Sequence, residues 1–286
     1  MTVSLRGTRV LLAADVSEPT SHAALDHLPM VGAAGGYRRG MSIHLVGGGW
    51  SPDAAVEVYR PFLHEAEARA AGAGRLVPRV AVLLVGEDAE SVAQSREKYS
   101  ATLRSVASVE PIVKTLIEGD LADSSLLSEI DALMIGGGLT PAYLDAVIPL
   151  IGEIRLLVAD GLPYLGFSAG AAIASEAALI GGWLIGGVAV TGEDNGEDLD
   201  EVTVVEGIGL IDLAVDVHAA QWGTLSRIVA ATEAGLVEGG VAIDEDTVLI
   251  VGDGTLSVRG AGSVWRVTLT DDGVLISTLG ADPDDQ

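Results

Sequence analysis

The sequence predicts an α/β fold in which a mostly parallel sheet is covered by helices on both faces. Short, continuous apolar runs are typical of strands buried on both sides, and here they alternate with longer segments of helical periodicity. Two of these strands end in triple-glycine turns, at 47–49 and 136–138. After about residue 248, short strands separated by Gly-Asp and Asp-Gly turns predict antiparallel hairpins that close the same domain.

The strands and helices expected before residue 168 alternate regularly. The helix at 54–71 is predicted from apolar residues at helical spacing. Pro141 opens a helix to about residue 160, because proline favours the first helical position. The other expected elements are strands at 42–46, 79–85, 112–117, 132–135 and 163–167, a helix at 91–106, a short helix at 126–130, a small-residue helix after residue 168, and hairpin strands at 248–251, 256–259, 263–270 and 274–279.

We expect a single domain over residues 41–280, preceded by an extension at 1–40 and followed by an acidic tail at 281–286. The apolar run at 10–14 has five residues, whereas the core of a secretory signal has about 7–15. No apolar run approaches the roughly 20 clean residues of a membrane-spanning helix. These features predict a soluble, cytoplasmic protein.

Composition argues against several classes of function. The 286 residues include 16 Lys+Arg and 41 Asp+Glu, which gives a formal charge of −25. Such a charge argues against binding to nucleic acid or to an anionic membrane. Cysteine is absent, which excludes disulfides, thiolate nucleophiles and cysteine-ligated metal sites.

The sharpest local signal is a G-x-S-x-G motif at 166–170, placed after a buried strand and before a helix. Small neighbours permit the strained turn that lifts the hydroxyl of Ser168 out of the sheet. The backbone N–H of Ala169 then points toward a developing oxyanion. A glycine-punctuated strand end without catalytic function is the simpler alternative.

A nucleophilic serine needs a base, and the chain has five histidines. His218 ends an apolar strand at 213–217, which is where α/β sheets place their ligands. The other four lie in the N-terminal extension, in the middle of a strand or on a charged helix: His22, His27, His44 and His64. Although a lone histidine is more often structural, its pairing with Ser168 favours His218 as the base.

Six sequence blocks occur in a specific order over about residues 42–260. They are Leu45-Val46-Gly47-Gly48-Gly49, Ile135-Gly136-Gly137-Gly138-Leu139-Thr140, Gly166-Phe167-Ser168-Ala169-Gly170, Asp216-Val217-His218, Leu225-Ser226-Arg227-Ile228-Val229 and Ile243-Asp244-Glu245-Asp246-Thr247. This combination resembles the S51 serine peptidases, the family of cyanophycinase and peptidase E. The resemblance implies a flavodoxin-like fold of the class I glutamine-amidotransferase type. The absence of cysteine is consistent with serine rather than thiol chemistry on such a fold.

The resemblance implies a role for each matching residue. Ser168 would be the nucleophile and His218 the general base, while the N–H of Ala169 and that of Gly137 or Gly138 would form the oxyanion hole. The family's acid is expected between the serine and the histidine, shortly after a Gly-Gly pair. Glu193 is the first candidate for this acid and Asp194 the second. No metal or organic cofactor is implied.

The substrate pocket departs from the family pattern. The matching pocket residues are Leu139, Thr140, Asp216, Val217, Trp222 and Arg227. In the family, positions of this kind hold β-aspartyl carboxylates. A glutamine of the family is replaced by Leu139 or Thr140. The family pattern has arginines at the positions held here by Trp222 and Thr224. Arg227 is the one arginine of that pattern that this sequence keeps. Losing the other two removes charge-assisted bidentate contacts, so we expect a changed specificity, toward a neutral or basic substrate.

We therefore expect a serine-type hydrolase that cleaves a short peptide or isopeptide bond, such as an isoaspartyl-type bond, through an acyl-serine intermediate. The implied partners are a small peptide substrate and, by resemblance alone, a second copy in a homodimer. One alternative is an inactive ligand-binding protein on the same fold. Another is an α/β-hydrolase esterase, although the 50-residue interval between Ser168 and His218 is short for that class.

Overall fold

The computed structural model describes residues 4–5, 8–9, 42–252 and 256–280. Most of the extension expected at 1–40 and the whole acidic tail expected at 281–286 lie outside these residues. Within the extension, two short strands pair antiparallel, β1 (Ser4–Leu5) and β2 (Thr8–Arg9). No helix of the described residues is long and apolar enough to cross a membrane.

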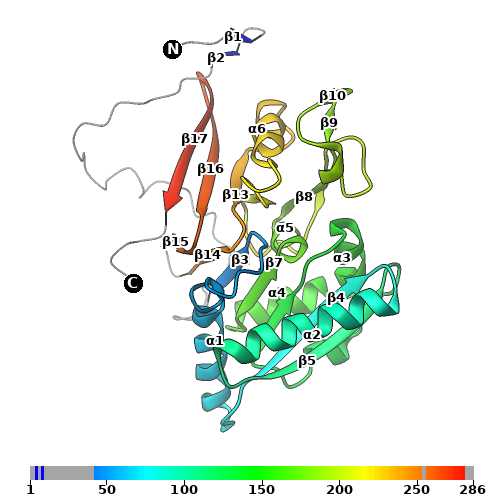
Figure 1. The fold of residues 1–286 in the computed structure, drawn as a ribbon, viewed down its shortest axis with the longest axis vertical. Coiled ribbons are helices and arrows are strands. Elements are labelled where there is room, and N and C mark those ends of the chain that lie inside the picture. Colours follow the sequence, from blue (N-terminus) through cyan, green and yellow to red (C-terminus); the bar gives the residue numbers. More distant parts are fainter. Residues whose placement is uncertain (1–3, 6–7, 10–41, 253–255, 281–286) are drawn as a thin grey trace, which may run out of the picture.

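A seven-stranded sheet forms the centre of the fold, in the order β15-β14-β3-β7-β6-β4-β5 (Figure 1). The five strands from β3 to β5 in this order are parallel, whereas β14 is antiparallel to both β3 and β15. The strands are β3 (Ile43–Val46), β4 (Arg79–Gly86), β5 (Glu110–Ile117), β6 (Ala132–Ile135), β7 (Tyr164–Phe167), β14 (Thr247–Val251) and β15 (Leu256–Gly260).

Helices cover both faces of this sheet. One face packs against α1 (Ala55–Gly72) and α2 (Ala89–Val106), and the other against α3 (Thr140–Val147), α4 (Ile151–Ala159) and α5 (Ala169–Ala172). Neighbouring strand residues point to opposite layers: Val82 packs in the first core and Leu83 in the second, as the alternation along a strand requires. The predicted α/β architecture with C-terminal antiparallel hairpins is confirmed.

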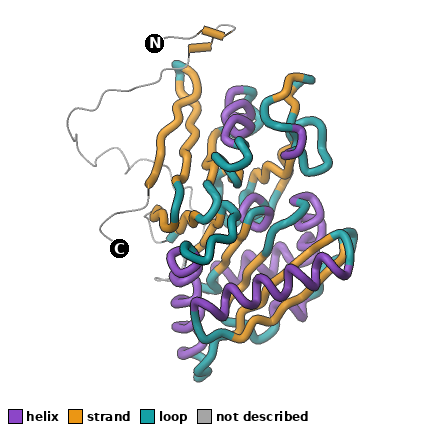
Figure 2. The backbone as a smooth tube through the Cα atoms, in the orientation of Figure 1, coloured by secondary structure: helices purple, strands orange, loops and turns teal. Residues whose placement is uncertain are grey.

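A second sheet, in the order β12-β13-β16-β17, lies above the main sheet in the view of Figure 1 and carries α6 on one side (Figure 2). The strand before His218 therefore belongs to this sheet and not to the main one. The remaining elements are β8 (Ala177–Gly181), β9 (Leu184–Ile185), β10 (Val188–Ala189), η4 (Glu193–Asn195), β11 (Thr203–Glu206), β12 (Ala214–Val217), α6 (Leu225–Glu233), β13 (Gly239–Ile243), β16 (Ser263–Thr270) and β17 (Gly273–Gly280).

Two predicted helices differ from the observed ones. The single helix expected from Pro141 to about residue 160 is interrupted by the 3₁₀ turn η3 (Ile148–Leu150). Pro149 explains the break, because proline has no N–H to donate and its ring clashes with the preceding turn. The helix expected at 126–130 is the 3₁₀ turn η2 (Ser124–Leu127), where the carboxylate of Asp123 accepts a hydrogen bond from the N–H of Ser125.

Asp244 links the end of β13 to two other segments. Its carboxylate accepts hydrogen bonds from Ala220 N–H at 3.0 Å, Ser263 N–H at 2.9 Å and Trp265 Nε1–H at 3.0 Å. The side chain is buried, and these three donors satisfy both of its carboxylate oxygens. One carboxylate thus joins the loop after β12, the turn after β13 and strand β16.

We predict that Asp244→Ala lowers the free energy of unfolding by about 3 kcal/mol, because three donors lose their acceptor. Urea denaturation followed by circular dichroism measures this change. Asp145→Ala is the matched control: Asp145 is exposed on α3, and its loss should change stability by no more than about 0.5 kcal/mol. Equal stability of the two variants would contradict the prediction.

Candidate active site

Ser168 occupies a sharp turn between β7 and α5. Its φ of 52° lies in the left-handed region, which is unfavourable for a residue with a Cβ and is often found at functional sites. A Cβ on Gly166 would collide with the carbonyl of Gly170, and one on Gly170 with the carbonyl of Ile135. Both motif glycines are therefore required by close backbone approach, as expected for a nucleophile elbow.

His218 follows β12 directly and faces the serine. Its Nε2 lies 2.8 Å from Ser168 Oγ, within the range of a hydrogen bond between a nucleophile and its base. The residue also has a left-handed φ, of 57°. On one side the imidazole touches the second glycine of the turn after β3, because a Cβ on Gly48 would overlap the ring.

The carboxylate that meets the imidazole belongs to Glu245, in the turn between β13 and β14. Its Oε1 lies 2.7 Å from His218 Nδ1, and its backbone N–H donates to Gln221 Oε1 at 2.9 Å. Neither candidate for the acid occupies this position: Glu193 and Asp194 lie in η4, on the loop between β10 and β11. The sequence contained a signal for Glu245 in its Ile243–Thr247 block, but that acid follows the histidine rather than preceding it.

The backbone of the turn after β3 holds these three segments together. Ser168 N–H donates to Val46 O at 2.9 Å, His218 N–H to Gly47 O at 2.9 Å, and Asp246 N–H to Gly48 O at 2.8 Å. Asp246 is the neighbour of Glu245, so three consecutive carbonyls position the serine, the histidine and the turn that carries the acid.

Burial controls the electrostatics of His218, whose exposed fraction is 7%. Burial lowers the pKa of His218 below its ordinary value of 6.5, although the hydrogen bond and charge of Glu245 and the charge of Asp216 act in the opposite direction. The charge of Arg227 lowers the pKa further. The geometry therefore favours a neutral imidazole that can accept a proton from Ser168.

The three predicted oxyanion donors are not equivalent. The N–H of Gly137 donates to Tyr99 Oη at 2.8 Å, so this donor already has an acceptor. For Ala169 N–H and Gly138 N–H, no acceptor is found among the described residues. Tyr99 was not anticipated, because nothing in its helical context indicates that its hydroxyl reaches the glycine turn. Burial raises its pKa well above the usual range, so the hydroxyl stays neutral.

Asp216 and Arg227, both expected to contact substrate, are paired with each other. Arg227 Nε lies 2.9 Å from Asp216 Oδ2 and Nη2 lies 2.7 Å from Oδ1. Arg227 Nη1 donates to Asn195 O at 2.6 Å and to Gly182 O at 3.3 Å. Both side chains are buried. The pair thus anchors the loop that carries η4 to β12 and α6. Because these hydrogen bonds occupy both side chains, few of their polar atoms remain free to bind a substrate.

The remaining predicted pocket residues lie in different environments. Thr140 is buried at the start of α3, and its N–H donates to Glu197 Oε2 at 2.9 Å. Burial raises the pKa of Glu197, against the opposing effects of Thr140 and the charge of Arg227. Leu139 precedes α3 and is half-buried, whereas Val217 is part of the main core. Trp222 stacks on His218.

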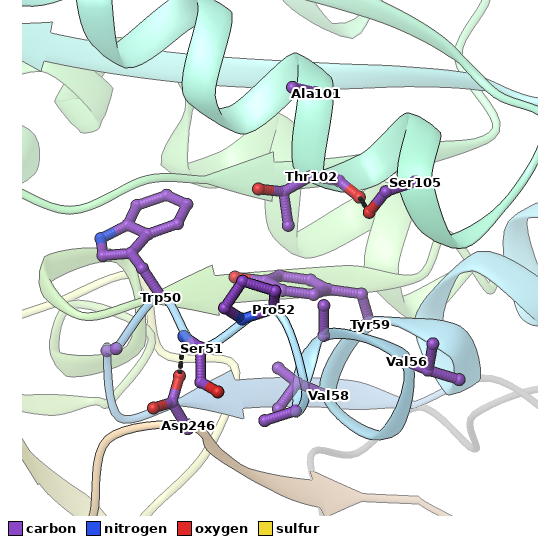
Figure 3. Close-up of a pocket in the computed structure, with 14 residues that line it drawn as sticks. Trp50, Ser51, Pro52, Val56, Val58, Tyr59, Ala101, Thr102, Ser105 and Asp246 are labelled. Carbon is purple, nitrogen blue, oxygen red and sulfur yellow. Dashed lines mark hydrogen bonds between the residues drawn. The ribbon is translucent and has the colours of Figure 1, made fainter.

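A cavity of about 420 Å³ lies between α1 and α2, beside the turn after β3 (Figure 3). Trp50, Tyr59 and Thr102 line it, and Asp246 closes one side, where its Oδ1 accepts Ser51 N–H at 2.8 Å. Neither Ser168 nor His218 is among the lining residues. Trp50 also packs on Phe167, with ring centroids 4.7 Å apart, so one wall of the cavity contacts the residue that precedes Ser168. In the described residues, no group of three or more His, Asp or Glu could hold a metal ion.

Comparison with known proteins finds relatives over part of the chain. No family model matches the sequence. A cyanophycinase from Synechococcus elongatus is 34% identical over 167 residues, which cover 54% of this chain and 49% of the relative. A cyanophycinase from Thermosynechococcus vestitus has the same identity and coverage. The chain thus spans about half the length of these curated relatives.

A solved structure shows the same fold over a larger part of the chain. The crystal structure of a peptidase from an acI-B1 Actinobacterium matches with a TM-score of 0.60 and 18% identity, and the match covers 85% of this chain and 96% of that one. At this identity the likeness concerns the fold alone. The cyanophycinase matches agree with the predicted resemblance to the S51 serine peptidases over about half of the chain, and the solved structure agrees with the predicted fold.

Proposed function

We propose that the protein is a serine-type peptidase that cleaves a short peptide or isopeptide bond through an acyl-serine intermediate. The observation that carries the proposal is the continuous chain of contacts from Ser168 Oγ to His218 Nε2 and from His218 Nδ1 to Glu245 Oε1, at 2.8 Å and 2.7 Å. A nucleophile, a base and an acid that orients the base are the elements that acyl transfer requires.

In acylation, Ser168 Oγ attacks the carbonyl carbon of the substrate while its proton passes to His218 Nε2. The imidazolium keeps its Nδ1–H on Glu245, and the oxyanion faces the N–H groups of Ala169 and Gly138. When the C–N bond breaks, the Nε2 proton goes to the leaving amine. A water then attacks the acyl-serine, gives its proton to His218, and the proton returns to Ser168 Oγ as the acid leaves.

The charges beside His218 favour a neutral or basic substrate. Asp216 and Glu197 are two carboxylates near one guanidinium, that of Arg227. Arg227 is already engaged by Asp216 and by two carbonyls. An acidic substrate side chain beside Arg227 would face an excess of carboxylates, and no unengaged guanidinium is present there to bind it. Such an arrangement is unfavourable at a poorly solvated site.

The two alternatives fit the geometry less well. An inactive binding protein on this fold would not need a carboxylate on the imidazole or a serine hydroxyl within hydrogen-bond distance of it. An α/β-hydrolase esterase places its acid between the serine and the histidine in the chain, whereas Glu245 follows His218.

We predict that a fluorophosphonate reagent labels the protein at Ser168, because the reagent captures a serine activated by a neighbouring base. Intact-mass spectrometry should show one adduct in the wild-type protein and none in Ser168→Ala. The matched control is Ser175→Ala, which removes a buried hydroxyl without a hydrogen-bond partner in the described residues and should leave labelling unchanged. Equal labelling of Ser168→Ala and the wild-type protein would refute the assignment.

A second prediction separates the acid found in the structure from those expected from the sequence. Glu245→Gln should lower kcat/KM by about 10²–10⁴-fold, because the amide no longer stabilises the imidazolium or selects its tautomer. Glu193→Gln and Asp194→Asn should stay within about twofold of the wild-type value, since surface substitutions of this kind leave the reacting groups in place. Steady-state hydrolysis of a dipeptide library measures the effect. A large loss in Glu193→Gln with none in Glu245→Gln would reverse the assignment.

The third prediction concerns pH. The pKa of His218 is lowered from 6.5, so the imidazole stays neutral at pH values where an ordinary histidine is already protonated. The midpoint of the acid limb of kcat/KM should therefore lie below pH 6.5, because kcat/KM declines as His218 takes up a proton. A pH profile of kcat/KM checks this, and a midpoint of the acid limb above 6.5 would contradict it.

A further inference from the structure

The indole of Trp222 lies flat on the imidazole of His218. The ring centroids are 3.8 Å apart and the planes are inclined by 6°. The other ring contacts in the described part of the chain are tilted or edge-on, with interplanar angles of 41° to 85°. Trp222 remains 49% exposed, whereas His218 is 7% exposed. One face of the indole thus covers the histidine, and burial of the indole does not by itself account for its position.

The backbone holds Trp222 in this place from both sides. Its N–H donates to His218 O at 2.9 Å, which closes the turn after β12. Its carbonyl accepts Asn195 Nδ2 at 2.9 Å, and Asn195 O in turn accepts a hydrogen bond from Arg227. The imidazole therefore has the indole stacked on one face and the Gly48 backbone close to its Cε1 atom, and rotation of the ring away from Ser168 would break the stacking contact.

The charged groups that face His218 come from three elements. Glu245, from the turn after β13, contacts Nδ1 directly. Asp216, from β12, and Arg227, from α6, form an ion pair and act on His218 through space in opposite directions: Asp216 raises its pKa and Arg227 lowers it. When His218 accepts the serine proton, the new charge forms in a site that solvent scarcely reaches. The face of an indole attracts a cation within about 6 Å of its centroid, so the stack can supply part of the stabilisation that water does not.

We propose that Trp222 is a positioning residue for the proposed reaction: it holds the imidazole of His218 in line with Ser168 and stabilises the imidazolium through its aromatic face. This role rests on the proposed function of His218 as general base. The stack itself is a property of the folded chain that does not depend on catalysis.

The kinetic test compares Trp222→Leu with Trp222→Phe, because both cover the imidazole and only Phe offers an aromatic face. In the Leu variant we expect the acid limb of the kcat/KM profile to move down by about half a pH unit and kcat to fall about threefold with little change in KM. The Phe variant should lie closer to the wild-type protein in both quantities. Identical pH limbs and kcat values in the Leu and Phe variants would overturn the proposal.

A spectroscopic test needs no turnover. A protonated imidazole quenches an indole stacked on it, so tryptophan emission should fall as pH is lowered through the titration of His218. We expect this transition in Ser168→Ala, which lacks the nucleophile, and its loss in Ser168→Ala/Trp222→Phe, which keeps Trp50, Trp183 and Trp265. Absence of the transition in Ser168→Ala would contradict the stacking of Trp222 on His218 and overturn the proposal. Absence of Ser168 labelling together with a normal transition would instead refute the proposed function.

Discussion

The turn after β3 is the constraint on which the candidate site depends. The carbonyls of Val46, Gly47 and Gly48 accept backbone hydrogen bonds from Ser168, His218 and Asp246. These donors belong to segments far apart in the chain, and two of them adjoin the second sheet. A side chain on Gly48 would overlap the imidazole, so the turn can approach this closely only as glycine. The register of one strand end thus fixes the geometry of the whole site.

The charged side chains around His218 are held by contacts within the protein. Arg227 is held by Asp216 and by carbonyls of the loop that carries η4, while Glu245 binds the imidazole. Carboxylates outnumber the one guanidinium in this region, in keeping with the formal charge of −25 of the whole chain. The buried arginine acts as an anchor for the loop, and a residue of the same type at a more exposed position would be available to a substrate.

The main sheet and the serine turn could be predicted because their signals are local. Buried strands are continuous apolar runs, and the serine turn needs small residues at fixed spacing. The interruption at Pro149 was local too, but the periodicity on either side concealed it. The membership of β12 in a second sheet was not predictable in this way, because a short apolar strand carries no information about its partner.

By itself the sequence determined the α/β class, the serine turn at Ser168 and the pairing of that serine with His218, since each depends on neighbouring residues or on residue scarcity. Only the tertiary structure decided that Glu245 rather than Glu193 meets the imidazole, that Asp216 and Arg227 bind each other, and that Trp222 covers His218. Spacing along the chain could not rank these partners, because hydrogen bonds and ring contacts depend on distances that are established only when separate strands and turns pack together.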